Sequence, residues 1–115
     1  MKVEFTPDQV KIMHICLDQW GAPAQVGQAV EECAELIVAL QKYVNRTPRP
    51  GMVENILDEI ADVEMMLAQM RVVLGIDDET LRKRIEHKFE RLKNQYLEAV
   101  FNFDNGEFSR QIFAD

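Results

Sequence analysis

Two stretches decide the fold: VEECAELIVAL, residues 30–40, and ENILDEIADVEMMLAQM, residues 54–70. In both, apolar residues recur at the spacing of an α-helix that buries one face. Both also carry carboxylates inside the apolar pattern. A carboxylate without a partner is costly to bury, so these charges need a physical explanation.

Around these stretches the sequence predicts four helices and no convincing strand, so the expected class is all-α. The first helix starts at Pro7 with Thr6 as its N-cap and runs to about residue 19. The second spans about residues 23–44, and the third runs from about residue 52 to 74 before Gly75, a typical C-cap residue. Asp77 is the expected N-cap of a fourth helix that continues to about residue 100.

The chain length predicts one domain. At 115 residues, the chain has the size of a single compact domain, so we expect residues 1–115 to form one unit. Residues 100–115 form a C-terminal tail with four phenylalanines. This apolar content predicts that the tail packs on something, such as a partner subunit.

The third helix places an acid in its apolar stripe. Glu59 falls between Ile56 and Val63, which is a core position at i, i+3, i+4 spacing. Asp62 lies three residues further on, on the same side of the helix. The third helix therefore contributes a Glu-x-x-Asp pair that points into a groove between helices or to its edge.

The second helix has two apolar stripes. Glu32 falls on one of them, and Glu35 is its i+3 neighbour. A helix that is apolar on two sides is sandwiched between others, and a second protomer is the simplest cover. We therefore expect a four-helix bundle completed by oligomerisation, as a homodimer or homotetramer. The stripes are Val26, Val30, Cys33, Ile37, Leu40, Val44 and Ala29, Leu36, Ala39, Tyr43.

The acids have three ways to avoid an unpaired buried charge: protonation, pairing with Lys or Arg, or binding a metal cation. A solvated groove, or pairing with Arg84, Lys88 or Arg91 of the fourth helix, remains an alternative. Four carboxylates from two helices suit a hard divalent cation such as Mg²⁺ or Mn²⁺, whereas zinc prefers His and Cys. The four carboxylates are those of Glu32, Glu35, Glu59 and Asp62.

These residues resemble a known family. EECAE followed by EIAD resembles the EExxE…ExxD signature of the MazG-like, all-α nucleoside triphosphate pyrophosphohydrolases, of the small single-domain type. HKFERL, residues 87–92, resembles the basic K-F-x-R element that the family carries on its next helix. The resemblance covers roughly residues 10–95.

The resemblance implies a reaction and a cofactor. Family members hydrolyse a nucleoside triphosphate or its deoxy form to the monophosphate and pyrophosphate with Mg²⁺, Mn²⁺ being possible, and build their site within dimers or tetramers. Their metal ligands map onto the four carboxylates named above. Glu31, the first acid of EExxE, is expected to assist a ligand or activate water, so Glu31 and Glu32 are the expected catalytic residues.

Basic and amide side chains are the expected substrate contacts. Lys88 and Arg91 share a face of the fourth helix and could hold the phosphate tail. The lysine ammonium would act as a point charge, and the planar arginine guanidinium would donate two parallel hydrogen bonds. Gln28 and Asn55 could touch the base or sugar. Two other functions remain open: phosphoribosyl-ATP pyrophosphatase, which would use the same site, and a non-catalytic helical module that binds nucleotides or a protein.

Composition restricts the partners. A net charge of −7 argues against non-specific nucleic-acid binding, which needs a basic face. No apolar run approaches the roughly 20 residues that span a bilayer, so no membrane partner is expected. The N-terminus lacks the apolar stretch of a signal peptide, and Cys16 and Cys33 form no CxxC pair, which together predict a cytoplasmic protein with reduced thiols.

Overall fold

A computed structural model describes residues 3–46, 49–97, 101–102 and 107–108. The chain divides into two compact units, Met1–Gly75 and Ile76–Asp115, and each is described by itself. Helices dominate both units, so the predicted all-α class is confirmed. The single domain that the length predicts stays a prediction. Among the described residues, no helix combines the length and apolarity needed to cross a bilayer.

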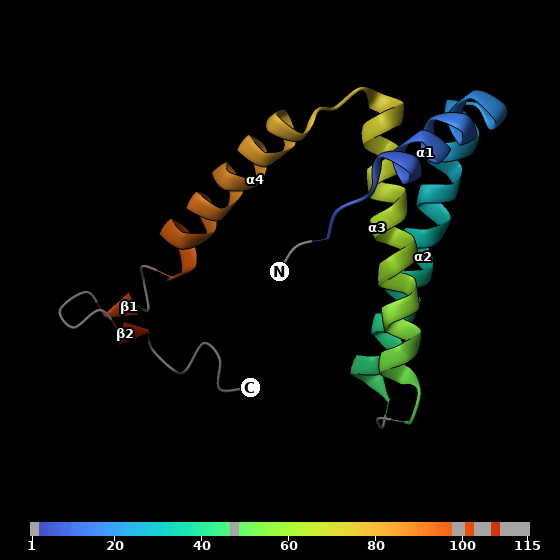
Figure 1. Ribbon diagram of the computed structural model, residues 1–115. Helices are drawn as coiled ribbons and strands as arrows, with labels where there is room; N and C mark the ends of the chain where they lie inside the picture. Colours follow the sequence, from blue (N-terminus) through green and yellow to red (C-terminus); the bar gives the residue numbers. More distant parts are fainter. Residues whose placement is uncertain (1–2, 47–48, 98–100, 103–106, 109–115) are drawn as a thin grey trace. The chain divides into compact units, whose positions relative to one another are not determined.

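The first unit consists of three helices, α1 (Pro7–Trp20), α2 (Ala22–Asn45) and α3 (Met52–Leu74). Helices α2 and α3 lie side by side along their lengths, and α1 lies across the end at which α2 begins and α3 ends (Figure 1). The pairing of α2 with α3 is the most extensive contact between helices in this unit. These are the two helices that carry the acidic motifs.

Local signals in the sequence set the helix ends. Thr6 and Gln9 form the predicted capping box, in which the Thr6 hydroxyl accepts from the Gln9 amide at 3.1 Å and the Gln9 side chain accepts from the Thr6 amide at 2.8 Å. Gly75 ends α3 with φ 65°, in the left-handed region that glycine adopts without strain. The predicted helix bounds agree with the structure to within one residue at the ends of α1, α2 and α3.

Small residues let α2 and α3 approach closely. Ala29 and Ala39 are the buried residues of α2, with 9 % and 5 % of their surface exposed. They belong to the same predicted stripe as Glu32, which is half-buried. On α3, Ile56 and Val63 are half-buried on either side of Glu59, as the stripe predicts. The helix faces that carry the acids are therefore the faces that meet.

The other predicted stripe of α2 has highly exposed members. Val30, Ile37 and Val44 recur every seven residues along it and are 64 %, 59 % and 76 % exposed. Helix α3 has a comparable row with the same spacing. Its exposed members are Val53, Ile60, Leu67 and Leu74. The second stripe of α2 therefore presents exposed apolar side chains, and the covering of this face by another helix stays a prediction.

A buried hydrogen bond ties α1 to α3. The Gln69 side-chain amide donates to the Met13 carbonyl at 2.8 Å, and only 4 % of Gln69 and 7 % of Met13 are exposed. A carbonyl within α1 normally accepts from its own helix, so Gln69 uses the second lone pair of this oxygen. This buried polar contact fixes the position of α1 on the other two helices.

The second unit begins with α4 (Asp78–Leu92), followed by one π-helical segment, Lys93–Leu97. Asp77 caps α4 as predicted and accepts from the Thr80 amide at 2.7 Å. The prediction of one regular helix to residue 100 was wrong from residue 93, because the backbone there adopts the wider π form, and residues 98–100 lie outside the described part.

The tail contains a strand pair that the sequence did not predict. Strands β1 (Phe101–Asn102) and β2 (Glu107–Phe108) pair antiparallel, with Phe101 opposite Phe108. Each strand has two residues, so the pair does not change the fold class. The remaining positions of the predicted tail, 100, 103–106 and 109–115, lie outside the described residues, and its packing on a partner subunit stays a prediction.

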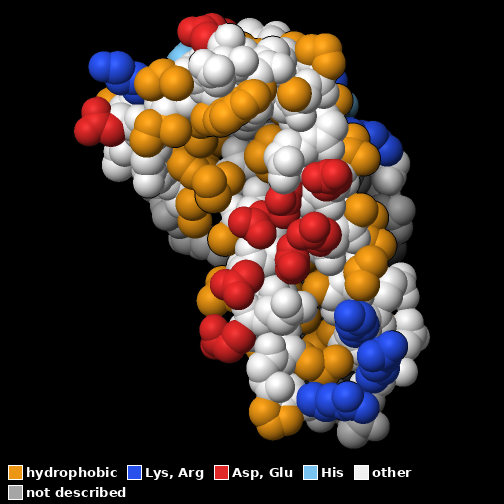
Figure 2. Space-filling model, turned by 90° about the vertical axis from the view of Figure 1, so that its right-hand side faces the viewer, with side chains coloured by type: hydrophobic (Ala, Val, Ile, Leu, Met, Phe, Trp, Pro, Cys, Tyr) orange, Lys and Arg blue, Asp and Glu red, His pale blue; other side chains and the backbone are white. Residues whose placement is uncertain are grey.

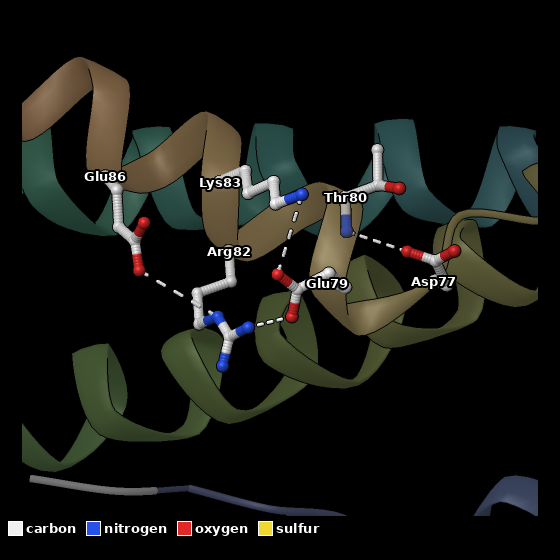
Figure 3. A network of polar contacts seen from close by, with 6 residues as sticks. All are labelled: Asp77, Glu79, Thr80, Arg82, Lys83 and Glu86. Carbon is white, nitrogen blue, oxygen red and sulfur yellow. Dashed lines mark hydrogen bonds and ion pairs between the residues drawn. The ribbon is translucent and has the colours of Figure 1, made fainter.

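Charged residues of α4 pair along their own helix (Figure 3). Arg82 contacts Glu79 and lies 3.8 Å from the Glu86 carboxylate, and the Lys83 ammonium is also 3.8 Å from Glu79. These contacts have i, i+3 and i, i+4 spacing, and more than half of each side chain is exposed. Such pairs stabilise an exposed helix by about 0.3–0.5 kcal/mol each.

Candidate metal centre

Four carboxylates converge where α2 and α3 meet. Glu32 and Glu35 come from α2, and Glu59 and Asp62 come from α3. One carboxylate oxygen from each of these residues lies within 4.8 Å of the corresponding oxygen of every other. The i, i+3 spacing within each helix sets both members of a pair on one side, and the packing of α2 on α3 brings the two pairs together.

Two of these carboxylates have a buried oxygen without a hydrogen-bond partner. The atoms are Oε2 of Glu32 and Oε2 of Glu59, one from each helix. Buried polar atoms in native proteins are nearly always satisfied, and a charged one is the most costly to leave unpaired. A ligand that supplies positive charge between the helices is therefore the simplest way to satisfy both atoms.

The electrostatics of the cluster agree with this need. Burial raises the pKa of Glu32 above its ordinary value, and the nearby charges of Glu35 and Asp62 raise it further. A hydrogen bond from the Gln28 side chain to Glu32, 2.8 Å long, opposes these effects and lowers the pKa. Without a cation, like charges repel one another here, and Gln28 holds one oxygen of Glu32 in place.

The ligand set fits a hard divalent cation. All four donors are carboxylate oxygens, which Mg²⁺ and Mn²⁺ prefer. Oxygens on opposite sides of one Mg²⁺ are about 4.2 Å apart, because each lies about 2.1 Å from the ion. All four oxygens lie within 4.8 Å of one another, which is close to this separation.

Other predicted site residues lie in different places. Glu31 is exposed and is not one of the four converging carboxylates. Asn55 is exposed near the start of α3 and lines a pocket there. Lys88 and Arg91 are exposed residues of α4, in the second unit, and their contact with phosphate stays a prediction.

The same two helices also form a basic pocket, which the sequence analysis did not identify. It lies where α2 ends and α3 begins and has a volume of about 290 Å³. Lys42, Arg46 and Arg49 line it. A signal was present, since three cations within eight positions stand out in a chain of net charge −7. Two prolines and a glycine in this segment indicate a loop, and a loop signal does not predict which side chains gather in a pocket.

Acidic and basic side chains gather on one face of the molecule (Figure 2). Asp and Glu side chains run across the middle of this view, and Lys and Arg side chains gather below them, toward the end at which α2 and α3 are joined. Apolar side chains surround both groups. Along the helix pair, a region of negative side chains is therefore followed by a region of positive side chains.

Comparison of the chain with protein-family models, with curated proteins and with solved structures found no match.

Proposed function

We propose that this protein is a Mg²⁺-dependent nucleoside triphosphate pyrophosphohydrolase of the MazG-like, all-α type. The observation that carries the proposal is the convergence of four carboxylates from α2 and α3, two of which keep a buried oxygen without a partner. The resemblance of EECAE and EIAD to the EExxE…ExxD signature supports it, because the residues that the resemblance selects as metal ligands are the four that converge.

Each residue has a role in this proposal. Glu32, Glu35, Glu59 and Asp62 hold the cation, with Mn²⁺ as an effective substitute for Mg²⁺. Bound there, the cation neutralises charge on the phosphates and lowers the pKa of water. Glu31 lies next to Glu32 in the chain and is exposed, so its carboxylate is free to accept a proton from an attacking water.

The proposed substrate contacts divide into two sets. Lys88 and Arg91 on α4 supply positive charge for the phosphates. Asn55 is exposed and remains available for the substrate. Gln28 is already engaged with Glu32, which favours the orientation of a metal ligand as its main role.

We also propose that the active protein is a homodimer or homotetramer. The exposed apolar rows of α2 and α3 support this, because scattered apolar residues are normal on a surface but aligned rows mark an interface. Val30 and Val44 are among the most exposed residues of these rows. The free thiols of Cys16 and Cys33 fit the reducing cytoplasm, where we place the protein.

The decisive experiment measures pyrophosphate release. The purified protein is incubated with a panel of canonical and modified nucleoside and deoxynucleoside triphosphates, with Mg²⁺, with Mn²⁺ and with a chelator. We expect release of pyrophosphate from at least one substrate, only with a divalent cation, and none from the Glu59→Gln variant. No release from any substrate with either metal would refute the proposal.

The same panel separates the alternatives. Phosphoribosyl-ATP is included, and turnover of this substrate alone would assign the phosphoribosyl-ATP pyrophosphatase activity. Calorimetry with each triphosphate identifies a non-catalytic binding module, since that function predicts binding without turnover.

A further inference from the structure

The basic pocket at the junction of α2 and α3 has no role in the function proposed above. Its cations are Lys42 from the last turn of α2, Arg46 at the C-cap of that helix, and Arg49 from the connection to α3. The rest of the wall comes mainly from the start of α3. It consists of Ala39, Pro50, Gly51, Met52 and Asn55.

The three cations are available to a ligand. Lys42, Arg46 and Arg49 are all exposed, and within residues 3–46 and 49–97 the structure shows no ion pair for any of them. This contrasts with Arg82 and Lys83, which pair with acids of α4. Unpaired like charges that line one pocket repel one another, and an anion between them relieves that repulsion.

The start of α3 adds to the positive potential. This helix has 23 residues, and its N-cap Gly51 provides no side-chain hydrogen bond to the first turn. The Met52 amide donates to the Arg49 carbonyl at 3.2 Å, and the positive end of the helix dipole points out of the first turn, as at helix ends that bind phosphate. Gly51 has φ 88°, and no side-chain or backbone atom lies within 4 Å of where a Cβ would stand, so this approach is open.

The pocket borders the carboxylate cluster. Ala39 and Asn55 line the pocket, and they lie four residues from Glu35 and Glu59 respectively. Four residues of helix are about 6 Å along the axis. The two sites are thus about one helical turn apart along both helices, a separation comparable with the length of a triphosphate chain.

We propose that this pocket binds the terminal phosphates of the nucleoside triphosphate and then the pyrophosphate formed from them. The inference rests on the proposed function and names the residues that recognise the leaving group. Metal-binding carboxylates repel a free polyphosphate, whereas Arg46 and Arg49 offer planar forks that pair with phosphate oxygens. The pocket therefore selects triphosphates over monophosphates, which do not extend far enough to reach both sites.

The test uses inorganic tripolyphosphate as the probe, without metal, in titration calorimetry on the full chain. The test variant is Arg46→Gln with Arg49→Gln. Its matched control is Arg82→Gln with Lys83→Gln, which removes the same charge from α4. We expect the test variant to bind tripolyphosphate at least about tenfold more weakly than the unaltered protein, and the control to bind as the unaltered protein does.

Two further measurements make the result specific. Mn²⁺ binding to the test variant should match that of the unaltered protein, because the carboxylates are intact. The charge-preserving variant Arg46→Lys with Arg49→Lys should bind tripolyphosphate more tightly than the test variant but more weakly than the unaltered protein, because it keeps the charge and loses the planar forks. Circular dichroism shows that each variant is folded. With an active substrate, the test variant should show a raised KM with kcat little changed.

The outcomes separate this inference from the proposed function. If the test variant loses tripolyphosphate binding and the α4 control does not, the phosphate-binding role of the pocket is supported. This holds even if the unaltered protein hydrolyses no nucleotide and the proposed pyrophosphohydrolase activity is refuted. Undetectable binding by the unaltered protein, equal binding by the test variant, or an equal loss in the α4 control overturns the pocket, whether or not pyrophosphate is released.

Discussion

The helix pair α2–α3 and the helix α4 both carry glutamates, but carboxylates on α4 have charged partners, whereas two of those between α2 and α3 keep a buried oxygen without a partner. On α4, Arg82 lies beside both Glu79 and Glu86, so charge is balanced within two turns of one exposed helix. Between α2 and α3, the Oε2 atoms of Glu32 and Glu59 are buried without a partner. The acids of α4 are satisfied by their neighbours, whereas those of the helix pair are not.

The difference shows where charge carries functional information. Exposed pairs along a helix are worth little and occur on many solvated faces. Carboxylates brought together from two helices repel each other and lose hydration, so the fold accepts them only if something offsets that cost. The arrangement of Glu32 and Glu59 therefore indicates a ligand, while that of Glu79 and Glu86 indicates solvent. The predictions below test this contrast.

The largest effect is expected for Glu59→Gln. The amide keeps the shape of the side chain but removes the charge of one of the four converging ligands. Metal affinity should fall by more than the roughly 10–100-fold that changes around a ligand cost, and pyrophosphate release should cease. Mn²⁺ titration followed by electron paramagnetic resonance measures the affinity.

The matched control for Glu59→Gln is Glu86→Gln on α4, which removes the same charge from an exposed pair. Its Mn²⁺ affinity should equal that of the unaltered protein. Equal losses in both variants would mean that the metal responds to net charge and not to the carboxylate cluster.

Divalent cations should stabilise the fold. A ligand that binds only the folded chain adds about 2.7 kcal/mol to the free energy of unfolding at 100 times its Kd. Urea unfolding with saturating Mg²⁺ and with a chelator measures the difference, which Glu59→Gln should abolish. If the stability of the unaltered protein did not depend on Mg²⁺, the carboxylates between α2 and α3 would not need a cation, and the contrast with α4 would be contradicted.

Gln69→Leu tests the buried contact that holds α1 on the helix pair. Loss of the hydrogen bond to the Met13 carbonyl should lower the free energy of unfolding by about 1–3 kcal/mol. Urea unfolding checks this value. Because Gln69 is not one of the four converging carboxylates, metal affinity should change less than in Glu59→Gln.

The pKa of Glu32 predicts a pH dependence for the metal-free protein. Because burial and neighbouring charges raise this pKa in the folded state above its ordinary 4.5, folding favours the protonated form. The resulting stability is present below pH 4.5 and is lost as the pH rises through the higher folded-state value. A cation binds the ionised form, so saturating Mg²⁺ should oppose this loss.

A series of thermal unfolding measurements from acidic to neutral pH tests the Glu32 prediction. In chelator, the unaltered protein should lose part of its thermal stability as the pH rises, because Glu32 ionises. The Glu32→Gln variant should not show this loss. An identical pH profile for both proteins would show that Glu32 is as well solvated as the acids of α4.

The smallest effect is expected for Arg82→Gln. This change removes two exposed contacts on α4 and should lower the free energy of unfolding by about 0.3–0.5 kcal/mol per pair at low salt, and by less at high salt. Helicity followed by circular dichroism at two salt concentrations measures it. A loss comparable with that of Gln69→Leu would contradict the view that the charges of Glu79, Arg82 and Glu86 are solvated.

The sequence by itself determined the helices and the positions of the acids on them. Capping by Thr6 and Asp77 and termination at Gly75 are local effects, which act within a turn of the chain. The helical period likewise placed Glu32 and Glu59 on inward-facing stripes. These features were predictable because they depend on residues three or four positions apart.

Only the tertiary structure decided how distant residues combine. The contact between Gln69 and Met13 joins positions 56 residues apart, and no local pattern predicts it. The assembly of Lys42, Arg46 and Arg49 into one pocket likewise depends on where α3 begins relative to the end of α2. Local periodicity assigns a residue to a face, but packing determines what that face meets, because burial and electrostatic interactions depend on distance in space and not along the chain.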